Sequence, residues 1–253
     1  GSATQPMNNL DLQNSAKWPA GFLKPGDVVR VVGSGGADRD LNTLTDNPAY
    51  EIGRGGVGNA ILSDGLTLQV PQGVSMQVDA GAIFKLQGSR ISVGSLSASI
   101  DQSLSSLQIL GTPAQSVQFT SFKDQSQGID TNPINTTPVQ GDWGGIDFHG
   151  DVDRIEGRGD YERQGIFLNY VAHADLRYGG GQITVSTPSP TVSPINMSES
   201  RPTLLYNTIR LSSDAAMAAD PNTFEETRFT HPRYQLAEVF RPDYVRVGPD
   251  IRG

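Results

Sequence analysis

Short groups of apolar residues recur along the chain from residue 60 onward, separated by turns rich in Gly, Pro, Asp, Asn and Ser. Leu66, Leu68 and Val70 alternate with polar residues, and residues 74–78 repeat this alternation. A period of two over a few residues is typical of β-strands with one buried face. The pattern predicts very short strands over residues 28–32, 66–70, 74–78, 82–86, 91–93, 107–110, 117–120, 146–148, 166–171, 183–185, 204–209 and 244–247.

Two architectures accept many very short strands, namely a sandwich or barrel and a β-solenoid. The loops vary from two residues near Pro71 to about 25 residues between Thr120 and Ile146. A solenoid tolerates such variation, because an insertion bulges from one coil without disturbing the stack. Small residues such as Ala80 and Gly81 suit the corners of a coil. We therefore expect an all-β solenoid.

One stretch departs from the strand pattern. Residues 214–220 are rich in Ala, and residues 224–229 combine Glu, Thr and Arg between two Phe. Both compositions are compatible with a helix. The sequence predicts one or two short helices here, packed against the solenoid.

The composition agrees with a narrow core. The chain holds 29 Gly and 16 Pro, or 45 residues together, and its apolar share is only 36%. Glycine and proline mark turns, and a thin stacked core needs few apolar residues per coil. The chain has no cysteine, which excludes disulfides, thiol chemistry and zinc–thiolate sites.

The charge balance excludes one class of partner. The net charge is −8 and the isoelectric point is about 4.8. An acidic domain is a poor partner for nucleic-acid phosphates and for anionic membrane surfaces. No apolar run approaches the roughly 18 residues that a transmembrane helix needs. Nucleic-acid binding and a transmembrane segment are therefore not expected.

Several strings resemble a known family. VPQGVSMQVDAGAIFK at 70–85, VQFTS at 117–121 and GDWGGI at 141–146 are similar to segments of right-handed parallel β-helices in very large exported proteins of environmental bacteria. Three further strings resemble the planctomycete version of this pattern: GIFLNY at 165–170, ADLRYGGG at 174–181 and RVGPD at 246–250. The resemblance implies a right-handed parallel β-helix in a secreted or cell-surface protein, and it transfers no catalytic residue.

The expected organisation has two parts. Gly1-Ser2 resembles a cleavage scar from recombinant expression, and residues 1–25 are expected to form an irregular leader. Residues 26–253 are expected to form one solenoid domain. Within it, 26–59 form an N-terminal cap with a strand and an acidic loop, and 60–253 form coils with long insertions, one of them near 121–141. The chain ends without a capping element and resembles an excised piece of a larger protein.

The acidic loop is the sharpest local pattern. Four oxygen-bearing residues fall at positions 1, 3, 5 and 9 of a calcium loop: Asp38, Asp40, Asn42 and Asp46. The match is incomplete, because Thr43 replaces the usual Gly and Ala49 the usual Glu. The alternative is a solvated turn rich in Asx residues. Ca²⁺ is the one cofactor that the sequence suggests.

A second acidic cluster contains the candidate catalytic residues. Glycoside hydrolysis needs paired carboxylates, and Asp142, Asp147 and Asp151 are the candidates if the protein is an enzyme. Acids and bases are interleaved here, which is more typical of a salt-bridged surface. Trp143 is the candidate for stacking on a sugar ring, although it can equally cover an adjacent coil.

Together these features favour a non-catalytic structural or adhesive module of a large bacterial surface or secreted protein, with calcium as a candidate stabiliser. Its expected partners are other modules of the same parent protein and surface polysaccharide. The alternative is a polysaccharide-binding or polysaccharide-degrading β-helix, acting as a lyase or glycoside hydrolase.

Overall fold

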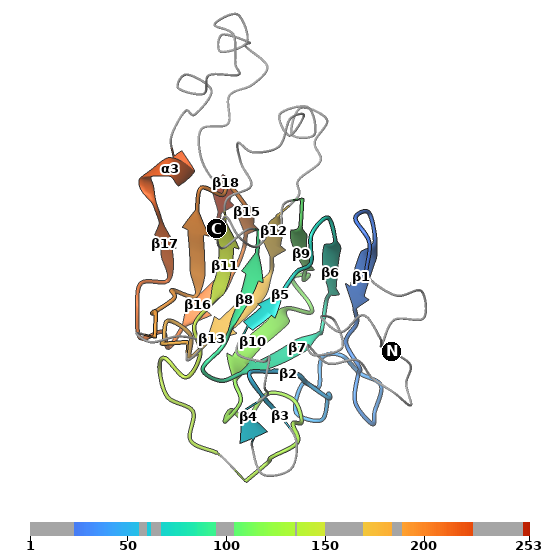
Figure 1. The fold of residues 1–253 in the computed structure, drawn as a ribbon. Coiled ribbons are helices and arrows are strands. Elements are labelled where there is room, and N and C mark those ends of the chain that lie inside the picture. The colour runs from blue at the N-terminus through green and yellow to red at the C-terminus, as the bar shows by residue number, and fades with distance from the viewer. Residues whose placement is uncertain are drawn as a thin grey trace, which may run out of the picture.

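The chain is seen here in a computed structural model, which describes residues 23–55, 60–61, 67–94, 104–134, 136–149, 169–183, 189–224 and 250–253. These residues are almost entirely strands and turns, and their one helix is the four-residue α3 (Pro221–Phe224) (Figure 1). Among them, no helix is long and apolar enough to cross a membrane.

The strands form three parallel sheets, which we number 1 to 3. Sheet 1 contains, in spatial order, β1 (Val28–Val31), β6 (Ser75–Asp79), β9 (Ser106–Leu110), β12 (Tyr170–Ala172), β15 (Thr203–Leu205) and β18 (Asp250–Arg252). Sheet 2 contains β2 (Tyr50–Ile52), β7 (Ile83–Leu86), β10 (Val117–Ser121), β13 (Ala174–Arg177) and β16 (Thr208–Arg210). Sheet 3 contains β5 (Thr67–Gln69), β8 (Arg90–Val93), β11 (Ile146–His149), β14 (Ile195–Ser198) and β17 (Met217–Ala219). A separate antiparallel pair joins β3 (Arg54–Gly55) to β4 (Ala60–Ile61).

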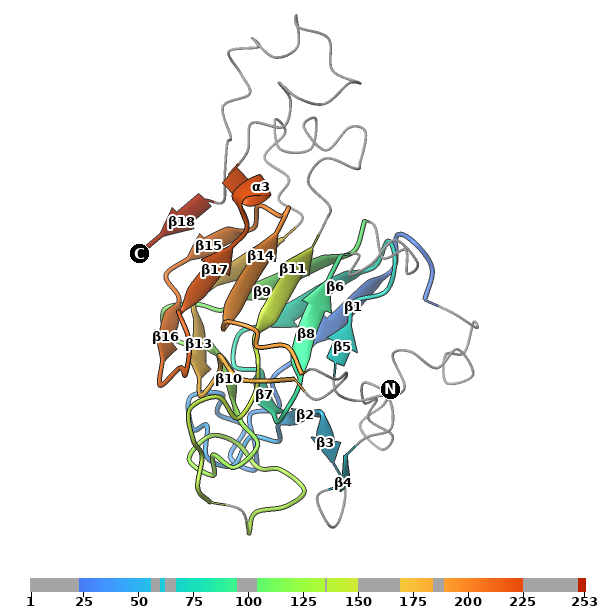
Figure 2. The same ribbon diagram turned by 60° about the vertical axis from the view of Figure 1, so that its left-hand side comes forward.

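Each coil contributes one strand to each sheet in turn. The chain passes from β6 to β7 to β8, and the next coil repeats the path as β9, β10 and β11 directly alongside (Figure 2). Connections as short as one residue, His173 between β12 and β13, and as long as the 24 residues 122–145 occur without a break in the ladders on either side. This is a parallel β-helix, which confirms the predicted fold class.

The core is built from columns of like residues at the same register position. In sheet 3 the column runs Leu68, Ile91, Ile146 and Ile195, all buried. Successive side chains of a strand point to opposite faces, so each coil adds only one or two residues per sheet to such columns. Each buried aliphatic side chain stabilises the fold by about 1.5–3 kcal/mol. This geometry accounts for the low apolar share of the chain.

Glycine permits the closest approach between coils. A Cβ added to Gly145 would lie 1.8 Å from the carbonyl oxygen of Ser193 in the next coil. A Cβ on Gly181 would lie equally close to the carbonyl oxygen of Gly141. The paired glycines of the GDWGGI string thus let the backbone of one coil lie against its neighbour.

The helix prediction for residues 214–220 is wrong. Residues Met217–Ala219 form strand β17, which continues sheet 3 in register with β14, and α3 is confined to Pro221–Phe224. Hydrogen bonding to β14 outweighs the helix propensity of the alanines. The strand predicted over 204–209 is two strands, because Tyr206 turns the chain with a φ of 53°. Residues 225–229 and the strand predicted at 244–247 lie outside the described residues.

Candidate functional site

Two long loops cover the outer face of sheet 2 at β7. The insertion between β10 and β11 pairs with the acidic loop, since Gly128 N donates to Leu44 O at 2.6 Å and Ile129 N donates to Asn47 O at 2.8 Å. Both loops lie beside β7 and β10 in Figure 2. The outward-facing Lys85 of β7 is consequently as inaccessible to solvent as the core.

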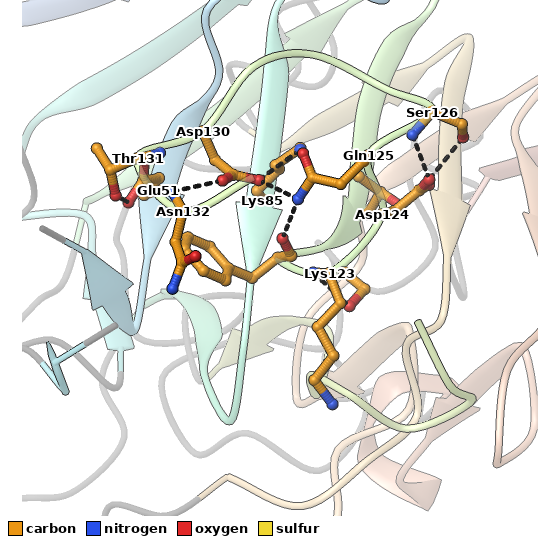
Figure 3. A network of polar contacts seen from close by, with 12 residues as sticks. Glu51, Lys85, Lys123, Asp124, Gln125, Ser126, Asp130, Thr131 and Asn132 are labelled. Carbon is orange, nitrogen blue, oxygen red and sulfur yellow. Dashed lines mark hydrogen bonds and ion pairs between the residues drawn. The ribbon is translucent and has the colours of Figure 1, made fainter. Parts of the chain in front are cut away.

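Beneath this cover lies a buried ion pair. Lys85 Nζ is 2.6 Å from Asp130 Oδ2, and both side chains are 0% exposed. Gln125 Nε2 donates to the same Oδ2 at 2.8 Å, and its own Oε1 accepts from Lys85 Nζ at 3.4 Å. The other carboxylate oxygen, Oδ1, accepts from Asn132 N at 2.8 Å. Every polar atom of the pair is therefore engaged (Figure 3).

A second carboxylate lies next to this pair. Glu51 of β2 is the register partner of Lys85, and its two oxygens accept from Thr131 N at 2.6 Å and from Thr131 Oγ1 at 2.9 Å. Burial raises the pKa of Glu51, and the nearby charge of Asp130 adds to this increase, although the Thr131 hydrogen bonds and Lys85 oppose it. Glu51, on β2, thus lies next to the strand that carries Lys85 and binds the residue that follows Asp130.

Asp142, a candidate catalytic residue, closes the base of the insertion. Its Oδ2 accepts from Ser121 Oγ at 2.6 Å and from Val139 N at 2.9 Å. Its Oδ1 is 2.7 Å from Lys123 Nζ. Ser121 and Lys123 lie at the start of the insertion and Val139 at its end, so the carboxylate ties the two ends together.

Trp143 lies in the core. Its side chain is fully buried, and its Nε1 donates to Arg177 O at 2.7 Å in the next coil. A sugar-stacking role does not fit this position, because neither face of the indole reaches solvent. The other role considered for Trp143, covering an adjacent coil, agrees with its contacts.

Asp147 lies on the outer face of sheet 3 and is also buried. Its Oδ2 is 2.8 Å from Arg90 Nη1, and its Oδ1 accepts from Asn196 Nδ2 at 2.7 Å. His149 Nε2 lies 2.8 Å from Oδ2 without the alignment of a hydrogen bond. The partners of Asp147 differ from those of Asp142, and Asp151 lies outside the described residues. Asp142 and Asp147 are thus each held by their own partners within the chain.

The acidic loop forms bonds within itself. Asp38 Oδ1 accepts from Asp40 N at 2.8 Å, and Oδ2 accepts from Thr43 Oγ1 at 2.6 Å. The Thr43 bond, followed by that of Asp40, lowers the pKa of Asp38. Asp40 Oδ1 in turn accepts from Asn42 N at 2.9 Å. These are Asx-type turns, in which each carboxylate caps a backbone N–H two residues later.

Asp46 points elsewhere, toward the turn before the loop. Its Oδ2 accepts from Ala37 N at 3.0 Å, and its Oδ1 is buried without a hydrogen-bond partner. Neighbouring Asn47 is fully buried, and its side-chain oxygen and nitrogen also have no partner. In the part of the chain that the structure describes, no three His, Cys, Asp or Glu residues lie close enough to hold a metal ion. Calcium binding stays a prediction.

An open polar groove of about 620 Å³ lies on the corner between sheets 2 and 3. Asp214 is held there by Ser193 Oγ, which donates to its Oδ2 at 2.9 Å. The polar side chains along the groove come from three segments: Gln140, Gln182, Thr191, Ser213 and Asp214. Sequence reasoning missed this groove, because its residues meet only when coils stack.

The Lys85 cluster was also missed. The sequence does carry one signal for it, a lysine within the apolar run 83–86. A charged residue in a strand usually faces solvent, so the signal becomes informative only once the insertion is known to cover that face.

Comparison with protein families, with curated proteins and with solved structures finds no match for this chain.

Proposed function

We propose that the chain is a non-catalytic structural or adhesive module of a large bacterial cell-surface or secreted protein. One observation carries the proposal. The two described candidate catalytic carboxylates, Asp142 and Asp147, are buried and bound to partners within the chain. A catalytic carboxylate has to reach a substrate, whereas these two connect parts of the framework.

Outward-facing polar residues also pair between coils. Ser106 Oγ donates to Ser75 Oγ at 2.8 Å, and Gln77 Nε2 donates to Gln108 Oε1 at 3.0 Å, both across sheet 1. Such polar columns stiffen a stack of coils, because each hydrogen bond joins residues about 31 positions apart in sequence. A stiff, extended scaffold suits a module that spaces or presents other parts of a large protein.

The proposal extends to partners and location. Other modules of the same parent protein and surface polysaccharide are the proposed partners, and Ca²⁺ at the acidic loop is the proposed ligand. A calcium titration by calorimetry, repeated with Asp38→Ala, tests Ca²⁺ binding at the acidic loop. Binding heat that the variant loses would support it, and no heat in the unmodified protein would refute it.

The polar groove supports a second candidate function, polysaccharide binding. Amide, hydroxyl and carboxylate groups are the partners that sugar hydroxyls use, and Gln182, Ser213 and Asp214 provide all three. The groove is shallow and wide open to solvent, which suits a long polymer.

Screening with anionic and neutral polysaccharides separates these functions. We expect no change in polymer length, measured by size-exclusion chromatography, for the unmodified protein and for Asp147→Asn. Binding without cleavage, reduced by Asp214→Asn, would support the groove. Cleavage abolished by Asp147→Asn but kept in Asp214→Asn would overturn the non-catalytic proposal.

A further inference from the structure

The buried pair of Lys85 and Asp130 has the arrangement of two reactants. The amine nitrogen lies 2.6 Å from a carboxylate oxygen, neither side chain touches solvent, and Glu51, the register partner of Lys85, is hydrogen-bonded to the adjacent Thr131. We propose that Lys85 and Asp130 condense to an intramolecular amide, an isopeptide bond, with Glu51 as the proton carrier. This inference stands independently of the proposed function.

Proximity favours the reaction. Lys85 is fixed on β7 between β2 and β10, and Asp130 is held by Gln125 and Asn132 of the insertion. Groups held in contact react as if present at about 10⁵–10⁸ M. An amide that does not form between free amines and acids in water can therefore form here, once the insertion closes over the sheet.

Removal of charge favours the product. A buried ion pair loses the hydration of two charges, and its attraction often fails to offset that cost. The amide carries no charge, and the water released leaves the site. Desolvation that makes the ion pair costly thus drives the condensation forward.

The groups present account for each atom. Lys85 ammonium passes one proton to Asp130 Oδ2 along their 2.6 Å contact, and the neutral nitrogen then forms a bond to Cγ. The charge that develops on Oδ1 is stabilised by the Asn132 N–H at 2.8 Å. Glu51 takes a second proton from the nitrogen and delivers it to Oδ2, which leaves as water when its bond to Cγ breaks. Glu51 ends the step unchanged, and nothing is oxidised or reduced.

The burial of Glu51 suits this role. A carboxyl group whose pKa is raised by burial holds and releases a proton more readily near neutral pH than an exposed one. Its two hydrogen bonds to Thr131 place it next to the residue that reacts.

Intact mass spectrometry of the denatured full chain tests the bond. We expect a mass about 18 Da below that of the sequence, the loss of one water. Trypsin should fail to cleave after Lys85, and one branched peptide should contain both Lys85 and Asp130. A mass equal to that of the sequence, with normal cleavage after Lys85, would overturn the proposal without any variant.

Variants assign the residues. Asp130→Ala and Lys85→Arg should both have their full sequence mass, and Asp130→Asn should lose about 17 Da, the mass of ammonia. Asp142→Ala is the matched control, since Lys123 and Asp142 are 2.7 Å apart but less buried, and it should keep the 18 Da loss. Glu51→Gln should have its full sequence mass. The 18 Da loss persisting in Glu51→Gln would overturn the role of Glu51, and its persistence in Asp130→Ala would overturn the bond.

Discussion

Asp175 illustrates how a single charged residue serves this fold. It lies on the outer face of sheet 2, where its Oδ2 accepts from Arg177 at 2.8 Å and from Arg210 of the next coil at 2.7 Å. Burial by itself raises the pKa of Asp175. The hydrogen bonds and charges of the two arginines together lower it by more, so that the net shift is downward. The ionised carboxylate is thus the form that stabilises the folded chain.

Replacing Asp175 by Asn should make stability less dependent on pH. A lowered pKa means that the carboxylate stabilises the fold above its unfolded pKa of about 3.9, and that this contribution is lost as the pH falls through the folded value. Near pH 7 we expect Asp175→Asn to lower the unfolding free energy by about 1–2 kcal/mol. The loss is modest because the Arg210 side chain is half exposed, so that its ion pair with Asp175 contributes little to stability. Urea unfolding measured from about pH 7 down to about pH 3 checks this. An equal cost at every pH would contradict it.

Residue types explain why some assignments were accessible from sequence. The alternation at 74–78 and the apolar run at 82–86 place β6 and β7 correctly, because local pattern alone decides which side chains face a core. The sequence singles out Asp142 and Trp143 as candidates, but their contacts depend on partners in other coils or at the far end of a loop. Such partners have no signature in the local sequence.

At the scale of the element, the aromatic column of sheet 2 is the clearest example of stacking. Phe84 lies between Tyr50 and Phe119, with ring centroids 5.4 Å and 5.0 Å away. The Phe84 and Phe119 rings are nearly parallel, at 6°. Three strands, β2, β7 and β10, are thus joined by one set of ring contacts in addition to their backbone hydrogen bonds.

Removing the Phe84 ring should therefore weaken the packing of three coils at once. Phe84→Ala removes a buried aromatic side chain, and we expect a loss of about 3–5 kcal/mol in denaturant unfolding. Ile134→Ala is the control, since Ile134 is 88% exposed and its loss should cost less than about 0.5 kcal/mol. Similar costs for the two variants would contradict the placement of Phe84 in the core.

Elements also mark where sequence prediction failed. β17 has the composition of a helix, and it becomes a strand because β14 offers it an edge in register. The covering of sheet 2 was equally inaccessible, because the length of the insertion after β10 indicates an excursion but not the surface on which it lies. The buried Lys85 cluster and the polar groove both follow from such long-range packing.

The described coils form a stack in which several charged residues hold coils and loops together. Asp147 bonds to Arg90 in the preceding coil and Asn196 in the following one, so a single carboxylate spans three coils. Asp142 joins the two ends of the insertion between β10 and β11. These residues are the catalytic candidates from the sequence, and under the non-catalytic function that we propose their contacts serve the framework.

Thermal unfolding of Asp147→Asn tests this central claim most directly. A framework carboxylate leaves Arg90 without its charge partner when replaced, so we expect a loss of about 2 kcal/mol and a melting temperature lower by about 4–8 °C. Asp40→Asn, measured with a chelator present, is the matched control at an exposed position and should shift little. A carboxylate retained for catalysis often destabilises the fold, so that its replacement leaves stability unchanged or raises it. An unchanged or higher melting temperature for Asp147→Asn would therefore contradict the account.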